Sequence, residues 1–70
     1  MSEDSFNMSL RKFLKTVGVT SQREIEDAVR AAEAAGSAPS GTVSAKVVLT
    51  VDGLNVTHEI TGEIAMPGSN

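Results

Sequence analysis

The side chains that could take part in catalysis are few. His58 is the single histidine, and the chain has no cysteine. A nucleophilic hydroxyl needs a base beside it, and neighbouring residues of a strand point to opposite faces, so Glu59 cannot assist His58. Glu24 and Asp27 lie one helical turn apart, but carboxylates at that spacing on an exposed helix are commonly only solvated. We therefore expect no catalytic residues, no metal site and no cofactor, and the chain is not predicted to be an enzyme.

His58 is predicted to have a structural role instead. In an alternating strand it shares a face with apolar residues, where a lone histidine most often packs, partly buried, with one hydrogen bond. Protonation of a buried imidazole costs stability, so we expect the fold to weaken below about pH 6.

A basic cluster in the N-terminal half, Arg11, Lys12 and Lys15, is the candidate partner-binding site. It holds three of the six basic residues of a chain with a formal net charge of −3. At about 100° per residue the cluster lies on the side of a helix away from Phe6 and Leu10. The simplest interpretation is a solvated face. The functional interpretation is contact with an acidic partner, which could be a protein patch, an RNA or an anionic membrane surface, and among these we favour a protein.

The stretch KTVGVTSQREIEDAVRAA, residues 15–32, is similar to the turn and second helix of a helix-turn-helix. In that motif the residues six and nine positions after the turn glycine are apolar. After Gly18 these positions hold Glu24 and Asp27. Acidic groups on this face would repel phosphates, where only Arg23 and Arg30 offer attraction. A capped helix corner is thus the favoured interpretation, and a nucleic-acid site the alternative.

Two short helices are predicted, at about 5–17 and 21–35. Asp4 or Ser5 is expected to cap the first helix, and Gly18 to end it. Ser21 and Glu24 have the spacing of a capping box for the second helix, which Gly36 would end. Both helices have apolar residues at intervals of three and four, namely Phe6, Leu10, Phe13, Leu14 and Val17 in the first and Ile25, Ala28, Val29 and Ala32 in the second.

A β-hairpin is predicted at about 43–64, after a flexible linker at 36–42. The sequence there alternates with period two around Asp52-Gly53, a dipeptide that favours a two-residue type I′ turn. That turn would pair Val51 with Leu54. Further out it would pair Leu49 with Val56, Val47 with His58, Ala45 with Ile60 and, on the other face, Lys46 with Glu59. Residues 66–70 are expected to fray.

These elements predict an α+β fold in the order ααββ, with the two short N-terminal helices packed on one face of the C-terminal antiparallel hairpin. Residues 1–70 form a single small domain whose core is barely sufficient, and no disulfide can reinforce it. We therefore expect a homodimer, formed through strand edges or helix faces. No signal peptide or membrane span is recognisable, so a cytoplasmic location with Met1 removed is expected.

The segment EDSFNMSLRKFLKTVGVTSQREIE, residues 3–26, resembles the opening of an uncharacterised family of small bacterial proteins of unknown function. The resemblance implies a small bacterial α+β protein with a hairpin-like C-terminal half. It supplies no activity, cofactor or site residue.

The function expected from the sequence is that of a small cytoplasmic interaction module that binds another protein. Its contact surfaces would be the basic cluster and any apolar area that the thin core leaves uncovered. The alternative is a nucleic-acid-associated regulator that uses the basic cluster together with Arg23 and Arg30. The salt dependence of binding distinguishes these two functions, because binding driven by contacts to phosphates weakens steeply as the salt concentration rises.

Overall fold

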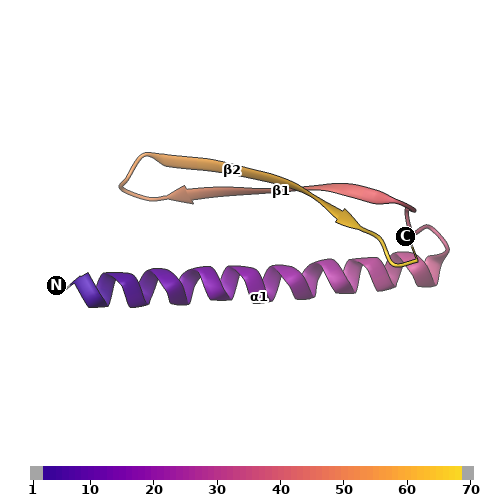
Figure 1. Ribbon diagram of the computed structural model, residues 1–70, viewed down its shortest axis with the longest axis horizontal. Helices are drawn as coiled ribbons and strands as arrows, with labels where there is room; N and C mark the ends of the chain where they lie inside the picture. Colours follow the sequence, from indigo (N-terminus) through magenta and orange to yellow (C-terminus); the bar gives the residue numbers. More distant parts are fainter. Residues whose placement is uncertain (1–2, 69–70) are drawn as a thin grey trace. The chain divides into compact units, whose positions relative to one another are not determined.

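The computed structural model describes residues 3–68, which form one helix and one β-hairpin (Figure 1). Helix α1 spans Glu3–Ala35, strand β1 spans Thr42–Val51 and strand β2 spans Val56–Ala65. The two strands make a two-stranded antiparallel sheet. The chain divides into two compact units, Met1–Ala38 and Pro39–Asn70. The α+β class is confirmed, but the prediction of two short helices is wrong, because a single helix of 33 residues takes their place.

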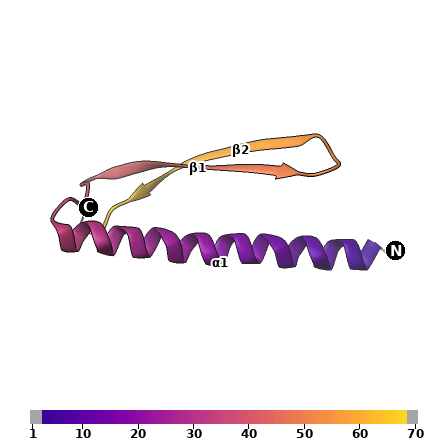
Figure 2. The same cartoon turned by 180° about the vertical axis from the view of Figure 1, so that it is seen from behind.

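The helix continues through Gly18, where the sequence predicted its end. It is unbroken in views from both sides (Figure 1 and Figure 2). Gly18 does not adopt the left-handed conformation of a helix-ending glycine. Glycine inside a helix costs about 1 kcal/mol relative to alanine. A break would instead leave up to four amides and four carbonyls without helical partners, so continuing the helix is favoured.

The residues predicted to form a corner lie inside the helix. Ser21 and Glu24 are helical residues and do not begin a second helix. The hydroxyl of Thr16 donates to the carbonyl oxygen of Lys12 at 3.0 Å, and that of Thr20 donates to the carbonyl oxygen of Thr16 at 2.7 Å. These threonines therefore satisfy their hydroxyls within the helix, where such groups can otherwise compete with the backbone.

Both ends of α1 follow from local chemistry. Glu3 and Asp4 lie in the first turn, where acidic groups interact favourably with the helix dipole. Because the helix begins at Glu3, Asp4 and Ser5 lie inside it, and the prediction that one of them caps the helix is wrong. At the other end Gly36 has a φ of 74°, its amide donates to the Glu33 carbonyl at 3.1 Å, and the Ser37 amide donates to the Ala32 carbonyl at 2.9 Å. This is a Schellman motif, which confirms Gly36 as the end of the helix.

The hairpin turn contains four residues, Asp52 to Asn55, and the predicted two-residue turn is wrong. Val51 pairs with Val56, and Gly53 and Asn55 have positive φ values of 86° and 54°. Asparagine tolerates the left-handed conformation better than most residues, so the chain can reverse over the longer loop.

The longer turn moves every predicted strand pair by two residues but leaves the two faces unchanged. His58, for example, lies opposite Leu49 and not opposite Val47. Because side chains alternate with period two, a shift of two keeps each residue on its predicted face. The mainly apolar face carries Val43, Ala45, Val47, Leu49 and Val51 of β1 and Val56, His58, Ile60, Gly62 and Ile64 of β2.

An ion pair joins the strands on the opposite face. The Nζ atom of Lys46 lies 3.7 Å from Oε2 of Glu59, although Lys46 is directly opposite Thr61. The predicted pair thus forms diagonally, which long side chains allow. Both side chains are more than half exposed, so solvent screening limits the contribution of the pair to a few tenths of a kcal/mol on average.

The open end of the hairpin is held beyond the last strand pair. The amide of Met66 donates to the carbonyl oxygen of Gly41 at 2.8 Å, and the Met66 side chain is 5% exposed, the one buried side chain among residues 3–68. The expectation that the chain frays from residue 66 is therefore wrong at Met66. Residues 69–70 of that expected tail, and Met1, lie outside the described residues.

Replacing Gly18 with alanine should stabilise the protein by about 0.5–1 kcal/mol, because a Cβ there meets nothing within 4 Å and alanine has the higher helix propensity. Urea unfolding followed by far-ultraviolet circular dichroism would measure this. The control is Gly36→Ala, which should destabilise because the φ of Gly36 is 74°. Destabilisation by Gly18→Ala would contradict the continuous helix.

Replacing Asn55 with valine should destabilise the hairpin by about 1–2 kcal/mol, because a β-branched residue is strained at a φ of 54°. In the two-residue turn Asn55 would be an extended strand residue, where valine is favourable. Urea unfolding monitored by NMR signals of β1 and β2 distinguishes the four-residue turn from the two-residue turn. Thr57→Val, within β2, is the matched control and should be neutral or stabilising.

Candidate interaction surface

The basic cluster predicted as a binding site lies on one segment of α1. Arg11, Lys12 and Lys15 are all exposed. Arg11 and Lys15 are one turn apart and form a row along the helix, whereas Lys12 lies roughly 100° further round than Arg11. Lys12 and Lys15 are three residues apart and therefore also neighbours on the helix surface, so the structure places all three cations on one side of α1.

A mainly apolar surface runs along the same helix, and Glu24, about five turns from Phe6, lies within its span. We call this surface the apolar stripe, and it consists of Phe6, Leu10, Phe13, Leu14, Val17, Ser21, Ile25, Ala28, Val29 and Ala32. At about 100° per residue these positions occupy less than half of the helix circumference. Val17, Ser21 and Ile25 are spaced by four, so the apolar faces of the two predicted helices are in phase. That spacing is the sequence signal by which the single stripe could have been found.

The large side chains of the apolar stripe are accessible. No residue of α1 is buried, and Phe6, Phe13 and Leu14 are 55%, 52% and 49% exposed. In ordinary cores phenylalanine and leucine are among the residues most often buried. From the sequence these residues are expected in a core, but in the structure they form an exposed surface.

A row of polar residues borders the stripe, and its charge changes sign along the helix. We call it the charged row; it contains Asp4, Arg11, Lys15, Gln22, Glu26 and Glu33. The Nε2 atom of Gln22 donates to Oε2 of Glu26 at 3.3 Å, as expected for residues four apart. After Asp4 in the first turn, the row is basic at Arg11 and Lys15 and acidic at Glu26 and Glu33.

The continuous helix also decides between the two interpretations of residues 15–32. A helix-turn-helix needs a turn between its helices, and α1 is helical from Glu3 to Ala35. The predicted corner, capped or DNA-binding, is absent. A nucleic-acid site that uses such a corner is therefore excluded.

Three residues of the hairpin are predicted to have structural roles, namely Asp52, Gly53 and His58. Asp52 and Gly53 lie in the turn, and the positive φ of Gly53 is the conformation for which glycine is suited. His58 lies on the mainly apolar face opposite Leu49 but is exposed. The expectation of a partly buried imidazole is wrong, and the pH sensitivity that depended on burial loses its basis.

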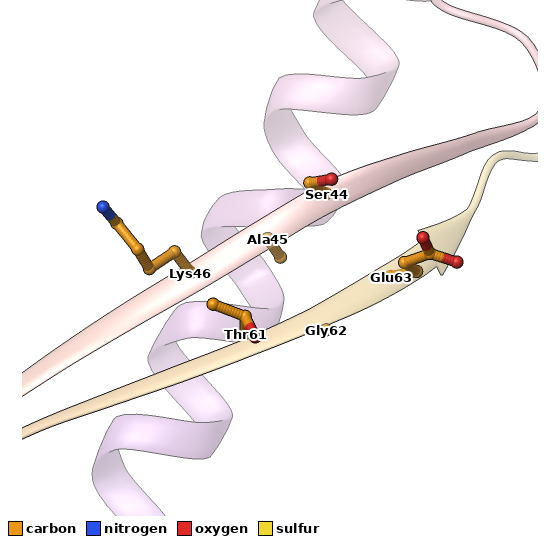
Figure 3. A pocket seen from close by; sticks show the side chains of 6 residues that line it. All are labelled: Ser44, Ala45, Lys46, Thr61, Gly62 and Glu63. Atoms are coloured by element: carbon orange, nitrogen blue, oxygen red, sulfur yellow. The ribbon is translucent and has the colours of Figure 1, made fainter.

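A depression of about 360 Å³ lies on the hairpin, lined by Ser44, Ala45, Lys46, Thr61, Gly62 and Glu63 (Figure 3). Gly62 has no side chain to fill it. The charged groups of Lys46 and Glu63 point away from each other, and the two hydroxyls have no histidine beside them in the lining (Figure 3). This arrangement provides polar contacts from both strands.

Neither a membrane-spanning helix nor a metal-binding cluster occurs among residues 3–68. No helix in this range is long and apolar enough to cross a membrane. Within the same range, no three residues among histidine, cysteine, aspartate and glutamate come together as a metal site would require.

Comparison with known proteins gives one match. The chain matches, over residues 1–67, the model of a family described as a family of unknown function, DUF6494. No curated protein and no solved structure is significantly similar to it. The match covers nearly the whole chain, and it confirms the expectation of an uncharacterised family that residues 3–26 raised. The chain belongs to the DUF6494 family, whose function is unknown.

Proposed function

We propose that the chain is a protein-interaction module whose contact surface is the apolar stripe of α1. The observation that supports this is the exposure of Phe6, Phe13 and Leu14, each about half accessible and all on one side of one helix. The proposal assigns binding to the chain and no catalytic step. It includes the cytoplasmic location expected from the sequence.

Helix energetics support a partner for the stripe. Most of the stability of a protein helix comes from packing its amphipathic face, because the hydrogen-bonded ladder alone is marginal in water. Fully burying one phenylalanine or leucine side chain contributes about 1.5–3 kcal/mol. Several such side chains are aligned on α1, so covering the stripe would stabilise the helix and bind the partner in one step.

The charged row supports orientation of the partner. Arg11 and Lys15 are exposed at the border of the stripe, where charges remain solvated when the apolar centre is covered. Such peripheral charges mainly affect the association rate and the choice of partner. The basic part of the row would therefore favour a partner with acidic residues beside its own apolar surface.

A photoreactive amino acid placed at Phe13 should crosslink to protein in cells that make the chain, because Phe13 lies among the large side chains in the N-terminal part of the apolar stripe. Val19 is the matched control position: it is apolar, 49% exposed and on the other side of α1. The measurement is the set of adduct masses after illumination. Discrete protein adducts from position 13 that are absent from position 19 are expected. Equal adducts from both positions, or none from either, would contradict the proposed surface.

A further inference from the structure

We propose that the partner of the apolar stripe is a second copy of this chain, bound antiparallel along α1. This inference rests on the proposed function, since it names the occupant of the same surface. It is carried by two properties of the stripe and its border that change along the helix, namely side-chain size and charge.

The size of the stripe residues decreases from one end of α1 to the other. The N-terminal half carries Phe6, Leu10, Phe13 and Leu14, and the C-terminal half carries Ala28 and Ala32 as well as Ile25 and Val29. When two antiparallel helices overlap over their full length, Glu3 of one copy is level with Ala35 of the other. Phe6 is then level with Ala32 and Leu10 with Ala28. Phe13 is level with Ile25 and Leu14 with Glu24. Two of the four large side chains thus meet alanine, and the separation of the helices varies less than it would if each large side chain faced its own copy.

A parallel pair would have no such complementarity. Each residue would be level with its own copy, so phenylalanine and leucine would face each other at one end and alanine would face alanine at the other. The separation of packed helices depends on the side chains at the contact. The two axes would have to diverge towards the N-terminal end, which would leave part of the apolar surface uncovered.

The charges favour the same orientation. In an antiparallel pair related by a two-fold axis, the charged row of one copy lies beside the charged row of the other. Arg11 and Lys15 are then close to Glu26 of the second copy, an attraction that occurs twice in the dimer. Asp4 and Glu33 meet at the exposed ends, where solvent screens their repulsion. In a parallel pair the two charged rows would lie on opposite sides of the contact, so these attractions between rows would not form.

The spacing of the stripe suits a long contact between nearly straight helices. Leu10, Ser21 and Ala32 are separated by eleven residues, as are Leu14 and Ile25, and Val17 and Ala28. An eleven-residue repeat corresponds to about 3.67 residues per turn, close to the 3.6 of a straight helix. The stripe therefore stays on one side of α1 over its full length of roughly 50 Å.

A lipid surface is the other possible occupant of an amphipathic helix, and the charges disfavour it. Helices that lie on membranes carry a polar face rich in lysine and arginine. In α1, residues 23–27 hold three acidic groups and one basic group, and the whole chain has a formal net charge of −3. This part of the helix would be repelled by an anionic lipid surface.

Sedimentation equilibrium of the purified full-length chain tests whether it self-associates. At concentrations from about 10 to 500 μM we expect a mass twice the 7.3 kDa of the chain. Phe13→Asp should raise the dissociation constant at least tenfold, because an ionised carboxylate would be buried against the second copy. Val19→Asp, on the other side of the helix, is the matched control and should leave the dissociation constant within about threefold.

Single-cysteine variants test the orientation, since the natural chain contains no cysteine. Leu10→Cys and Ala28→Cys chains are mixed, mildly oxidised and analysed by mass spectrometry. The antiparallel pair predicts that the mixed disulfide between the two variants exceeds the disulfides within each variant by at least fivefold. A Val19→Cys chain reports the rate of random collision. Dominant disulfides within each variant would show a parallel pair and overturn the proposal.

The remaining outcomes separate this inference from the proposed function. A chain that stays monomeric up to about 500 μM would overturn the proposal that a second copy covers the stripe. In that case a crosslink from position 13 to a different protein would still support the interaction module. Vesicles of phosphatidylglycerol are added to the chain in a parallel arm. Binding of the chain to these vesicles without self-association would assign the stripe to a lipid surface and overturn both proposals.

Discussion

The uninterrupted backbone hydrogen-bond ladder of α1 is the constraint on which the other features depend. A turn at Gly18 would give two short helices whose apolar faces could point in different directions. Because the ladder continues through Gly18 and Ser21, the faces merge into one stripe and the charges fall into one row. The cost of a glycine inside the helix is about 1 kcal/mol. The hydrogen bonds around it outweigh that cost, so one local balance determines the surface that the protein presents.

Exposure of the stripe follows from the limits of a short chain without disulfides. A domain of this size buries a small share of its surface, and Met66 is the single buried side chain in the described part of the chain. Exposed apolar groups are a source of binding energy. The exposed stripe is therefore the observation that supports association as the proposed function. Membership of a family of unknown function is compatible with that role and adds no activity to it.

The two faces of the hairpin do not depend on whether the turn has two or four residues, whereas the cross-strand pairs do. The four-residue turn ends with Asn55 in a left-handed conformation and moves every cross-strand pair by two residues. The period of a strand is two, so the faces predicted for the two-residue turn survive. The ion pair between Lys46 and Glu59 also survives, as a diagonal contact, because both side chains are long and exposed. Composition of a face is thus fixed more firmly than the partner of any one residue.

Sequence alone determined the α+β class, the end of the helix at Gly36, the position of the hairpin and the composition of its faces. Each of these depends on local chemistry or on a period, both of which can be read along the chain. The tertiary structure decided whether Gly18 ends a helix, which residues pair across the strands, and whether His58 and the large residues of α1 are covered. Glycine is compatible with both a helix interior and a helix end, and Asp-Gly with more than one turn length. Such alternatives differ by about 1 kcal/mol, so hydrogen bonding over a whole element selects between them.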